Sequence, residues 1–242
     1  MYKILEQISF QGLFLYNPSM TKQIQYKLLE HFELLKTIGY TYSSPFDINR
    51  CATNHFELPN DLEQLKILVE NCNLCEFSKL KKQTDFSQGN CHANIMFIDE
   101  TPSIISDEQN RLVLGKSGEL LIAMIENVLN VPHNEFYFAH IIKCKTTLKK
   151  EPTACEISSC KPYLDQQIKL VNPKLIVALG ENCYRSLTQD KTNLEQIRGK
   201  ILKYNGVDIM PIYHPNYLLR NPSSKKEAFA DMLKIKSLLE QM

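Results

Sequence analysis

Four short apolar runs, each followed by a stretch with helical spacing, constrain the fold of this chain most strongly. The runs are NIMFID (94–99), FYFAHII (136–142), KLIVALG (174–180) and VDIMPIY (207–213). The helical stretches cover 118–130, 156–171, 181–189 and 225–242. Strands that alternate with helices are typical of βαβ units, in which helices cover both faces of a mainly parallel sheet. We therefore predict a three-layer α/β/α fold with a mainly parallel, four-stranded central sheet.

The first sixty residues do not follow this pattern. Residues 20–38 have apolar side chains at helical spacing, and Gly39 is a suitable C-cap. Residues 40–61 contain many turn formers and no periodicity, so they are predicted to form a connector. We place the main boundary near residue 60, with an amino-terminal helical extension and connector over 1–60 and one α/β domain over 61–242.

Sequence features also set an expected location. No apolar run approaches the ~20 residues that span a bilayer, and residues 1–16 lack an apolar segment followed by a small-residue cleavage site. We therefore expect a cytoplasmic, monomeric protein that does not bind membranes. Because the cytoplasm keeps thiols reduced, the eight cysteines are expected to be ligands, core residues or reactive thiols. The net charge of +1 gives no global argument for nucleic-acid binding.

Four cysteines have the spacing of a metal site. Cys72 and Cys75 have two residues between them, and Cys144 and Cys160 have fifteen. Four thiolates can bind zinc or an iron–sulfur cluster, and the spacing does not decide between these. Cys155 is close enough to Cys160 in sequence to be a rival fourth ligand. We expect the other four cysteines to be small buried side chains: Cys51, Cys91, Cys155 and Cys183.

Seven motifs occur in an order that resembles a known family. They are the C-x2-C pair, FIDETPSIISDEQNRLVLGKSGELL, FYFAHIIKC, EISSCKPYL, LIVALGENC, IRGK and YHPNYLLRNP. Together they resemble the family-four uracil-DNA glycosylases, the iron–sulfur branch of that superfamily, over residues 66–241. The resemblance implies a DNA repair enzyme that flips uracil out of DNA and hydrolyses its N-glycosidic bond. It also implies that a largely structural 4Fe–4S cluster is bound by Cys72, Cys75, Cys144 and Cys160.

Uracil excision places demands on the pocket. The base must leave the stack before its glycosidic bond becomes accessible. As this bond breaks, negative charge develops on uracil and positive charge on the sugar. A hydrogen-bond donor near uracil O2 and a carboxylate near the sugar or the attacking water are therefore useful. His214, directly after the last strand, is the candidate donor, and Glu100, after the first strand, is the candidate carboxylate.

The segment after His214 predicts contacts with DNA. Leu218 and Leu219 precede Arg220 between two prolines. An apolar wedge can fill the gap that a flipped base leaves, while arginine binds a phosphate. We expect Leu218 to be the wedge, although one or both leucines packing in the core is the alternative. A basic rim that faces DNA is expected around the cluster from Lys79, Lys81, Lys82, Lys143, Lys145, Lys149 and Lys150.

The predicted base pocket departs from the family pattern at three places. Asp99 and Ser103 stand where the family motif G-E-x-P-G has glycines, with Thr101 between them. Val113 stands where the family has an aromatic residue that stacks on uracil. His140 replaces the family's asparagine. An amide can donate to uracil O4 and accept from N3–H, whereas one imidazole nitrogen cannot do both. We expect Asp99, Thr101, Val113 and His140 to contact the base in a different way.

These departures leave several functions open. The first is a uracil-DNA glycosylase with a divergent pocket, whose partner is DNA that contains uracil. The second is a glycosylase for another damaged base. The third is a non-catalytic, cluster-bearing DNA-binding protein, and a zinc-stabilised α/β protein of unrelated function is a fourth. The retained Glu100, His214 and wedge motif favour the first function.

Overall fold

The computed structural model describes residues 58–81, 83–102, 115–132, 134–145 and 151–241. Several predictions therefore concern residues outside the described ranges: the amphipathic helix over 20–38, the buried Cys51, the glycine replacement Ser103, the base contact Val113, and the lysines Lys82, Lys149 and Lys150. Among the described residues, no helix is both long enough and apolar enough to span a membrane.

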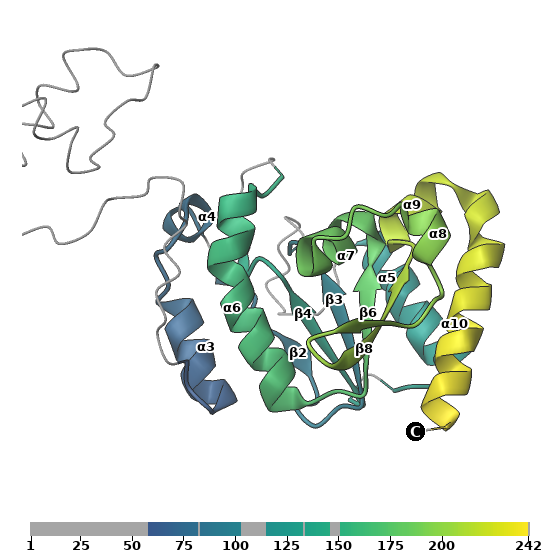
Figure 1. The fold of residues 1–242 in the computed structure, drawn as a ribbon, viewed down its shortest axis with the longest axis horizontal. Coiled ribbons are helices and arrows are strands. Elements are labelled where there is room, and N and C mark those ends of the chain that lie inside the picture. Colours follow the sequence, from purple (N-terminus) through teal and green to yellow (C-terminus); the bar gives the residue numbers. More distant parts are fainter. Residues whose placement is uncertain (1–57, 82, 103–114, 133, 146–150, 242) are drawn as a thin grey trace, which may run out of the picture. The chain divides into compact units, whose positions relative to one another are not determined.

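Six strands form the central sheet, in the order β2-β4-β3-β6-β8-β7 (Figure 1). Their bounds are β2 (Gln88–Gly89), β3 (Ile95–Asp99), β4 (Phe136–His140), β6 (Leu175–Leu179), β7 (Leu202–Tyr204) and β8 (Val207–Ile212). The inner strands β4, β3, β6 and β8 are parallel, whereas β2 and β7 pair antiparallel at the two edges. The four predicted strands are confirmed. The edge strands were missed because two or three residues are too few to show a period.

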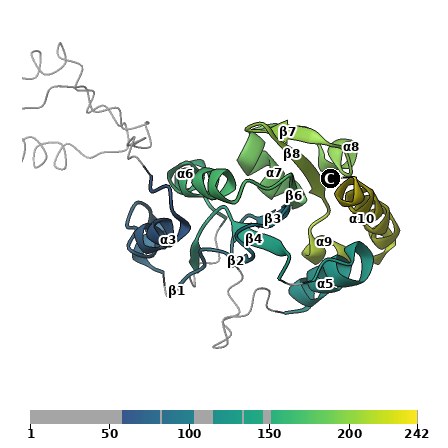
Figure 2. The same ribbon diagram turned by 90° about the horizontal axis from the view of Figure 1, so that it is seen from below.

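Helices cover both faces of the sheet, as Figure 2 shows. The longer helices are α3 (Leu62–Glu70), α5 (Lys116–Met124), α6 (Ala154–Val171), α7 (Gly180–Thr188) and α10 (Lys225–Glu240). Shorter elements are α4 (Glu76–Lys79), the π-helical turn η1 (Ile125–Leu129), α8 (Leu194–Ile197), α9 (Pro215–Arg220) and the 3-10 turn η2 (Pro222–Ser224). A separate two-stranded ribbon joins β1 (Gln83–Thr84) to β5 (Cys144–Lys145). The three-layer α/β/α prediction is confirmed.

The two faces of each inner strand pack into different cores. On β3, Met96 and Ile98 join the core formed with α6 and α7, while Ile95 and Phe97 join the core formed with α5 and α10. A strand that is buried on both faces has a continuous apolar sequence rather than an alternating one. This burial explains why the four strands were visible as apolar runs. A third, smaller core packs α3 and α4 against α6 around Cys144 and Cys160.

The parallel strands bring their carboxyl ends to one edge of the sheet. Asp99 ends β3 and is the register partner of His140, which ends β4. Gly180 begins α7 directly after β6, and His214 follows β8. Ligands of open α/β sheets bind beyond this edge. The predicted catalytic residues therefore lie where the fold places a binding site.

Candidate active site and cysteine pocket

His214 and Asp99 form a hydrogen-bonded pair at this edge. Nε2 of His214 lies 3.1 Å from Oδ2 of Asp99. Nδ1 of His214 accepts the backbone N–H of Asn216 at 3.0 Å and thereby caps α9. Because Nδ1 accepts a hydrogen bond, the neutral ring has its proton on Nε2 and donates it to Asp99. The two side chains are 25% and 21% exposed, so a ligand can reach the pair.

The pair changes the pKa of both members. Burial opposes ionisation of Asp99, but the hydrogen bond and charge of His214 hold its pKa below the ordinary value. Burial also opposes the imidazolium form, yet Asp99 and the charge of Glu100 raise the pKa of His214. Opposite charges in close contact favour each other's ionised forms in this way. Asp99 is therefore an anion at neutral pH.

Gly180 makes room for the His214 side chain. The residue has a φ of +88°, and a Cβ atom there would lie 2.9 Å from the Cβ of His214. Glycine adopts this left-handed conformation without the steric cost that other residues have. Because β6 lies between β3 and β8, His214 must reach across the start of α7 to meet Asp99. A larger residue at position 180 would push the ring away from Asp99.

Glu100 is held by a residue that the sequence did not indicate. The Oγ atom of Ser186 on α7 donates a hydrogen bond of 3.0 Å to Oε1 of Glu100. Burial raises the pKa of Glu100, and the charge of Asp99 adds to this effect, while the Ser186 hydrogen bond opposes it. A carboxylate with a raised pKa is better suited to accept a proton from water. Ser186 lies three residues after Cys183, whose thiol donates to the Ile98 carbonyl, so this face of α7 packs on the end of β3; the sequence carried no signal for this contact.

His140 is buried at the end of β4, with only 4% of its surface exposed. Its Nδ1 lies 3.8 Å from Oδ2 of Asp85, a residue outside every motif of the sequence. Its ring packs edge-to-face on Phe138, with the centroids 5.0 Å apart. Thr101, also predicted to contact the base, is half-buried just after β3. The sheet edge thus gathers Asp99, His140 and His214, whereas Thr101 has no described contact with them.

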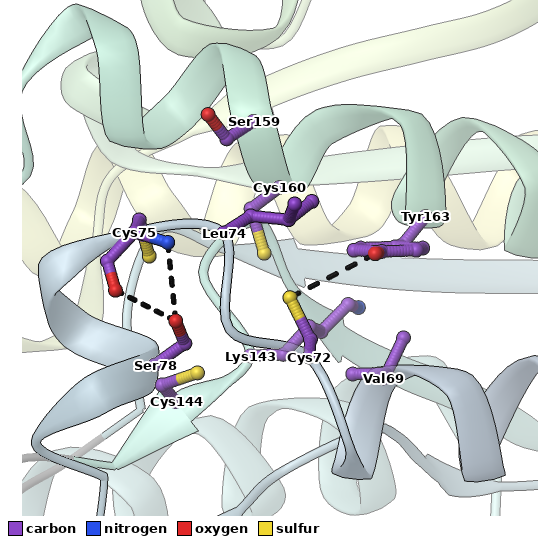
Figure 3. Close-up of a pocket in the computed structure, with 10 residues that line it drawn as sticks. All are labelled: Val69, Cys72, Leu74, Cys75, Ser78, Lys143, Cys144, Ser159, Cys160 and Tyr163. Carbon is purple, nitrogen blue, oxygen red and sulfur yellow. Dashed lines mark hydrogen bonds between the residues drawn. The ribbon is translucent and has the colours of Figure 1, made fainter. Parts of the chain in front are cut away.

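The four predicted cysteine ligands line one pocket (Figure 3). Cys72 and Cys75 come from the segment between α3 and α4, Cys144 from β5 and Cys160 from α6, and their sulfur atoms face a common space. The pocket contains about 270 Å³ of empty volume, part of which is open to solvent. The rival ligand Cys155 is exposed and does not line the pocket. Five residues along an α-helix correspond to a rotation of about 140° beyond one full turn, so Cys155 and Cys160 point in different directions.

The pocket provides thiols, which are the ligand type of zinc sites and iron–sulfur clusters. Burial raises the pKa of Cys144 to about 11 and that of Cys160 to about 12, and neighbouring thiol groups add to both shifts. A bound metal reverses this preference because it favours the thiolate form. The Tyr163 hydroxyl donates to the Cys72 sulfur at 3.7 Å. Within the described part of the chain, no three His, Cys, Asp or Glu side chains form a group that could hold a metal ion.

Lys143 lines the same pocket from the interior. Its side chain is fully buried, and Nζ donates to the Phe86 carbonyl at 3.2 Å and to Oε1 of Gln167. Burial lowers the pKa of Lys143 to about 8. The expectation that Lys143 belongs to an exposed basic rim is wrong, because a buried ammonium group cannot contact a phosphate. Lys81 instead supports the C-x2-C segment, since its Nζ donates to the Cys72 carbonyl at 3.2 Å.

The two leucines of α9 have opposite environments. Leu218 is 1% exposed and packs in the core, whereas Leu219 is 39% exposed. Consecutive residues of an α-helix point about 100° apart, so a helix that packs on the domain cannot expose both. The prediction that Leu218 is the DNA wedge is therefore wrong. Leu219 and the neighbouring Arg220 are exposed, as are Asn216 and Tyr217 earlier in α9.

Comparisons with known proteins agree with this geometry. The uracil DNA glycosylase superfamily model matches residues 86–234, which include Asp99, Glu100 and His214. The type-4 uracil-DNA glycosylase of Sulfurisphaera tokodaii is 31% identical over 187 residues, which cover 74% of this chain and 85% of that protein. The type-4 enzyme of Saccharolobus solfataricus is 28% identical over 188 residues, 74% of this chain and 87% of the relative. That of Pyrobaculum aerophilum is 29% identical over 182 residues, 71% and 91% of the two chains. The chain therefore belongs to the uracil DNA glycosylase superfamily.

Proposed function

We propose that this protein is a uracil-DNA glycosylase that hydrolyses the N-glycosidic bond of uracil in DNA during base excision repair. The observation that supports the proposal most is the meeting of Glu100 and His214 at the carboxyl edge of the sheet, beside Asp99. Both residues lie in the segment that matches the superfamily. The names of the relatives, type-4 uracil-DNA glycosylases, indicate the substrate.

In this proposal Glu100 acts on the sugar side of the bond. Its ionised carboxylate stabilises the positive charge that develops on the sugar and accepts a proton from the attacking water. The raised pKa of Glu100 suits proton transfer, and the Ser186 hydrogen bond fixes the position of the carboxylate. A fixed carboxylate needs no reorganisation as the bond breaks, which is the main advantage of a preorganised site.

His214 acts on the base side of the bond. The Nε2 proton is the donor for the negative charge that develops at uracil O2. Capping of α9 through Nδ1 fixes the ring and keeps the proton on Nε2. A donor that is preorganised for a developing anion contributes most when the charge is greatest. The products are free uracil and DNA with an abasic site.

We also propose that Cys72, Cys75, Cys144 and Cys160 hold a 4Fe–4S cluster. Four thiols around one pocket are the ligand set of such a cluster. Four thiolates can also bind zinc, and the resemblance of the cysteine motifs to the iron–sulfur branch of the superfamily favours the cluster. When bound, the cluster would join the α3–α4 segment to β5 and α6. The role proposed for it is structural.

DNA that contains uracil is the proposed partner. Leu219 and Arg220 on α9 follow the candidate donor directly and are exposed. We assign Leu219 to the gap that the flipped base leaves and Arg220 to a phosphate. We retain the expectation of a cytoplasmic monomer as part of this proposal.

Excision of another damaged base is the second candidate function. It is favoured by Asp99, which places a carboxylate beside the candidate donor, and by His140, which places an imidazole on the strand next to Asp99. A panel of oligonucleotides separates the candidates: uracil opposite guanine, uracil opposite adenine, single-stranded uracil, hypoxanthine and xanthine. Release of uracil supports the first function, and release of only a different base supports the second. Tight DNA binding without release of any base would instead identify a non-catalytic DNA-binding protein.

A further inference from the structure

The candidate donor of this site already has an acceptor within the protein. The Nε2 proton of His214 is directed at Oδ2 of Asp99, 3.1 Å away, while Nδ1 accepts from the Asn216 backbone. Both ring nitrogens are therefore in use before any base arrives. The Asp99 carboxylate is also fixed, because its Oδ1 accepts the Glu100 backbone N–H at 2.7 Å. A base can receive the His214 hydrogen bond only if its own acceptor replaces the carboxylate.

We propose that Asp99 is a positioning residue that acts through His214. It keeps the Nε2–H group of His214 available for the uracil anion that develops during the reaction. This inference rests on the proposed function and deepens it. In the base-free site Asp99 fixes the ring with its proton on Nε2. During the reaction, uracil O2 takes the place of Oδ2 as the acceptor. The bond that Asp99 makes is thus an internal substitute for the bond that the leaving base makes.

The strengths of the competing acceptors explain why this arrangement favours the reaction. A hydrogen bond from imidazole to a carboxylate is stronger than one to a neutral carbonyl. Uracil O2 is a neutral carbonyl oxygen in the bound substrate, so it competes poorly with Asp99. As the glycosidic bond breaks, O2 becomes negatively charged and competes on similar terms. An interaction that is made mainly in the transition state accelerates the chemical step without tightening substrate binding.

The arrangement also makes a prediction about binding before the bond breaks. Because Asp99 weakens the first contact with every base that presents a carbonyl at this position, uracil and thymine alike gain little from His214 while their glycosidic bonds are intact. A base recovers the hydrogen bond only as it leaves as an anion. Asp99 therefore lowers the affinity for intact bases and has less effect on the transition state for excision.

Substitution of Asp99 by asparagine tests the inference, because asparagine keeps an oxygen acceptor and removes the charge. The probe is a duplex that contains 2′-fluoro-deoxyuridine, whose sugar resists cleavage, compared with the same duplex containing thymine. Asp99→Asn should bind the fluorinated uracil duplex about two- to tenfold more tightly than wild type does, the range expected for one hydrogen bond. Unchanged or weaker binding by Asp99→Asn would overturn the inference.

Repeating the Asp99→Asn substitution in a His214→Asn variant shows whether Asp99 changes the affinity for DNA through His214. His214→Asn keeps a good helix N-cap on α9 but removes the Nε2 donor. If Asp99 acts through His214, adding Asp99→Asn to His214→Asn should leave the affinity for the fluorinated duplex unchanged. An equal gain in both backgrounds would show that Asp99 affects DNA directly and would contradict the proposal.

Histidine NMR provides a readout that does not depend on activity. In wild type the proton of neutral His214 should lie on Nε2, and Asp99→Asn should lower the pKa of His214 because the carboxylate charge is lost. An unchanged His214 pKa would overturn the inference even if excision is normal. Conversely, the pKa of His214 could depend on Asp99 in a protein that releases no uracil. That result would refute the proposed function but would establish the interaction between Asp99 and His214.

Discussion

The hydroxyl of Ser186 donates a 3.0 Å hydrogen bond to the carboxylate of Glu100 and so links α7 to the end of β3. The interaction holds a carboxylate whose pKa is raised by burial, and the nearby charge of Asp99 raises it further. A buried charge of this kind opposes folding, while its position beside His214 supports catalysis. Glu100 is therefore a residue at which stability and activity should change in opposite directions.

Replacing Glu100 with glutamine should stabilise the fold and slow excision. Because the folded-state pKa is raised, ionisation of Glu100 costs stability as the pH rises from below the ordinary value of 4.5 through the folded-state pKa. At neutral pH the melting temperature of Glu100→Gln should exceed that of wild type, and the difference should vanish below pH 4.5. For the same reason, as the pH is lowered, the rate of excision by the wild-type protein should begin to fall at a pH above 4.5. Glu126→Gln, an exposed matched change, should alter neither property; a lower melting temperature for Glu100→Gln would contradict the account.

The cysteine pocket predicts which thiols retain iron. Cys72→Ala and Cys160→Ala should lose iron and the brown colour after purification without oxygen, because each removes one of the four thiols that line the pocket. Cys91→Ala is the matched control, since this thiol is free and exposed. Iron content and visible absorbance provide the measurement. If Cys160→Ala kept its iron while Cys155→Ala lost it, the assignment of the fourth ligand would be incorrect.

Lys143 should influence the electronic properties of the proposed cluster. Its ammonium group is buried beside four cysteines, and a cluster bound by four thiolates is an anion that a buried cation stabilises. The reduction potential of such clusters depends on nearby charge. Lys143→Met should therefore make the potential more negative and speed the loss of iron. Lys169→Met, an exposed change on α6, should have no effect; equal potentials in wild type and Lys143→Met would refute this role.

The two leucines of α9 should separate stability from DNA binding. Leu218→Ala should reduce the free energy of unfolding by about 2–5 kcal/mol, because it removes a fully buried side chain. Leu219→Ala should change stability little and should slow excision from duplex DNA more than from single-stranded DNA, which leaves no gap to fill. Chemical denaturation and excision assays on the two substrates measure these effects. A large loss of stability in Leu219→Ala would show that its exposure does not describe the protein in solution.

Most of the fold could be predicted because the burial of a strand determines the pattern of apolar residues in its sequence. The four inner strands are covered on both faces, so runs such as IMFI (95–98) are apolar without interruption. The edge strand β2 has only two residues, and its pairing depends on β4 rather than on its own composition. The burial of Leu218 rather than Leu219 depends on how α9 packs on the domain, which sequence spacing over six residues cannot show.

The site was predictable in its residues but not in its contacts. The positions of Glu100 and His214 after strands made both of them candidates, and the cysteine spacing indicated the pocket. The hydrogen bond between Asp99 and His214 requires β8 to lie two strands away from β3, with β6 between them, and sequence alone does not give that strand order. Ser186 required the orientation of α7. These contacts depend on tertiary packing between residues that are 86 and 115 positions apart in the sequence.

Single-turnover release of uracil from a duplex with uracil opposite guanine, in excess protein, tests the central claim most directly. The wild-type protein should release uracil and leave an abasic site. His214→Asn, which retains the cap of α9, should release uracil about 10²–10³ times more slowly, the usual loss for one preorganised donor. Its affinity for undamaged DNA should remain that of wild type. If wild type binds the duplex and retains its iron but releases no uracil, or if His214→Asn releases uracil at the wild-type rate, the assignment of this sheet edge as a uracil-excising site is contradicted.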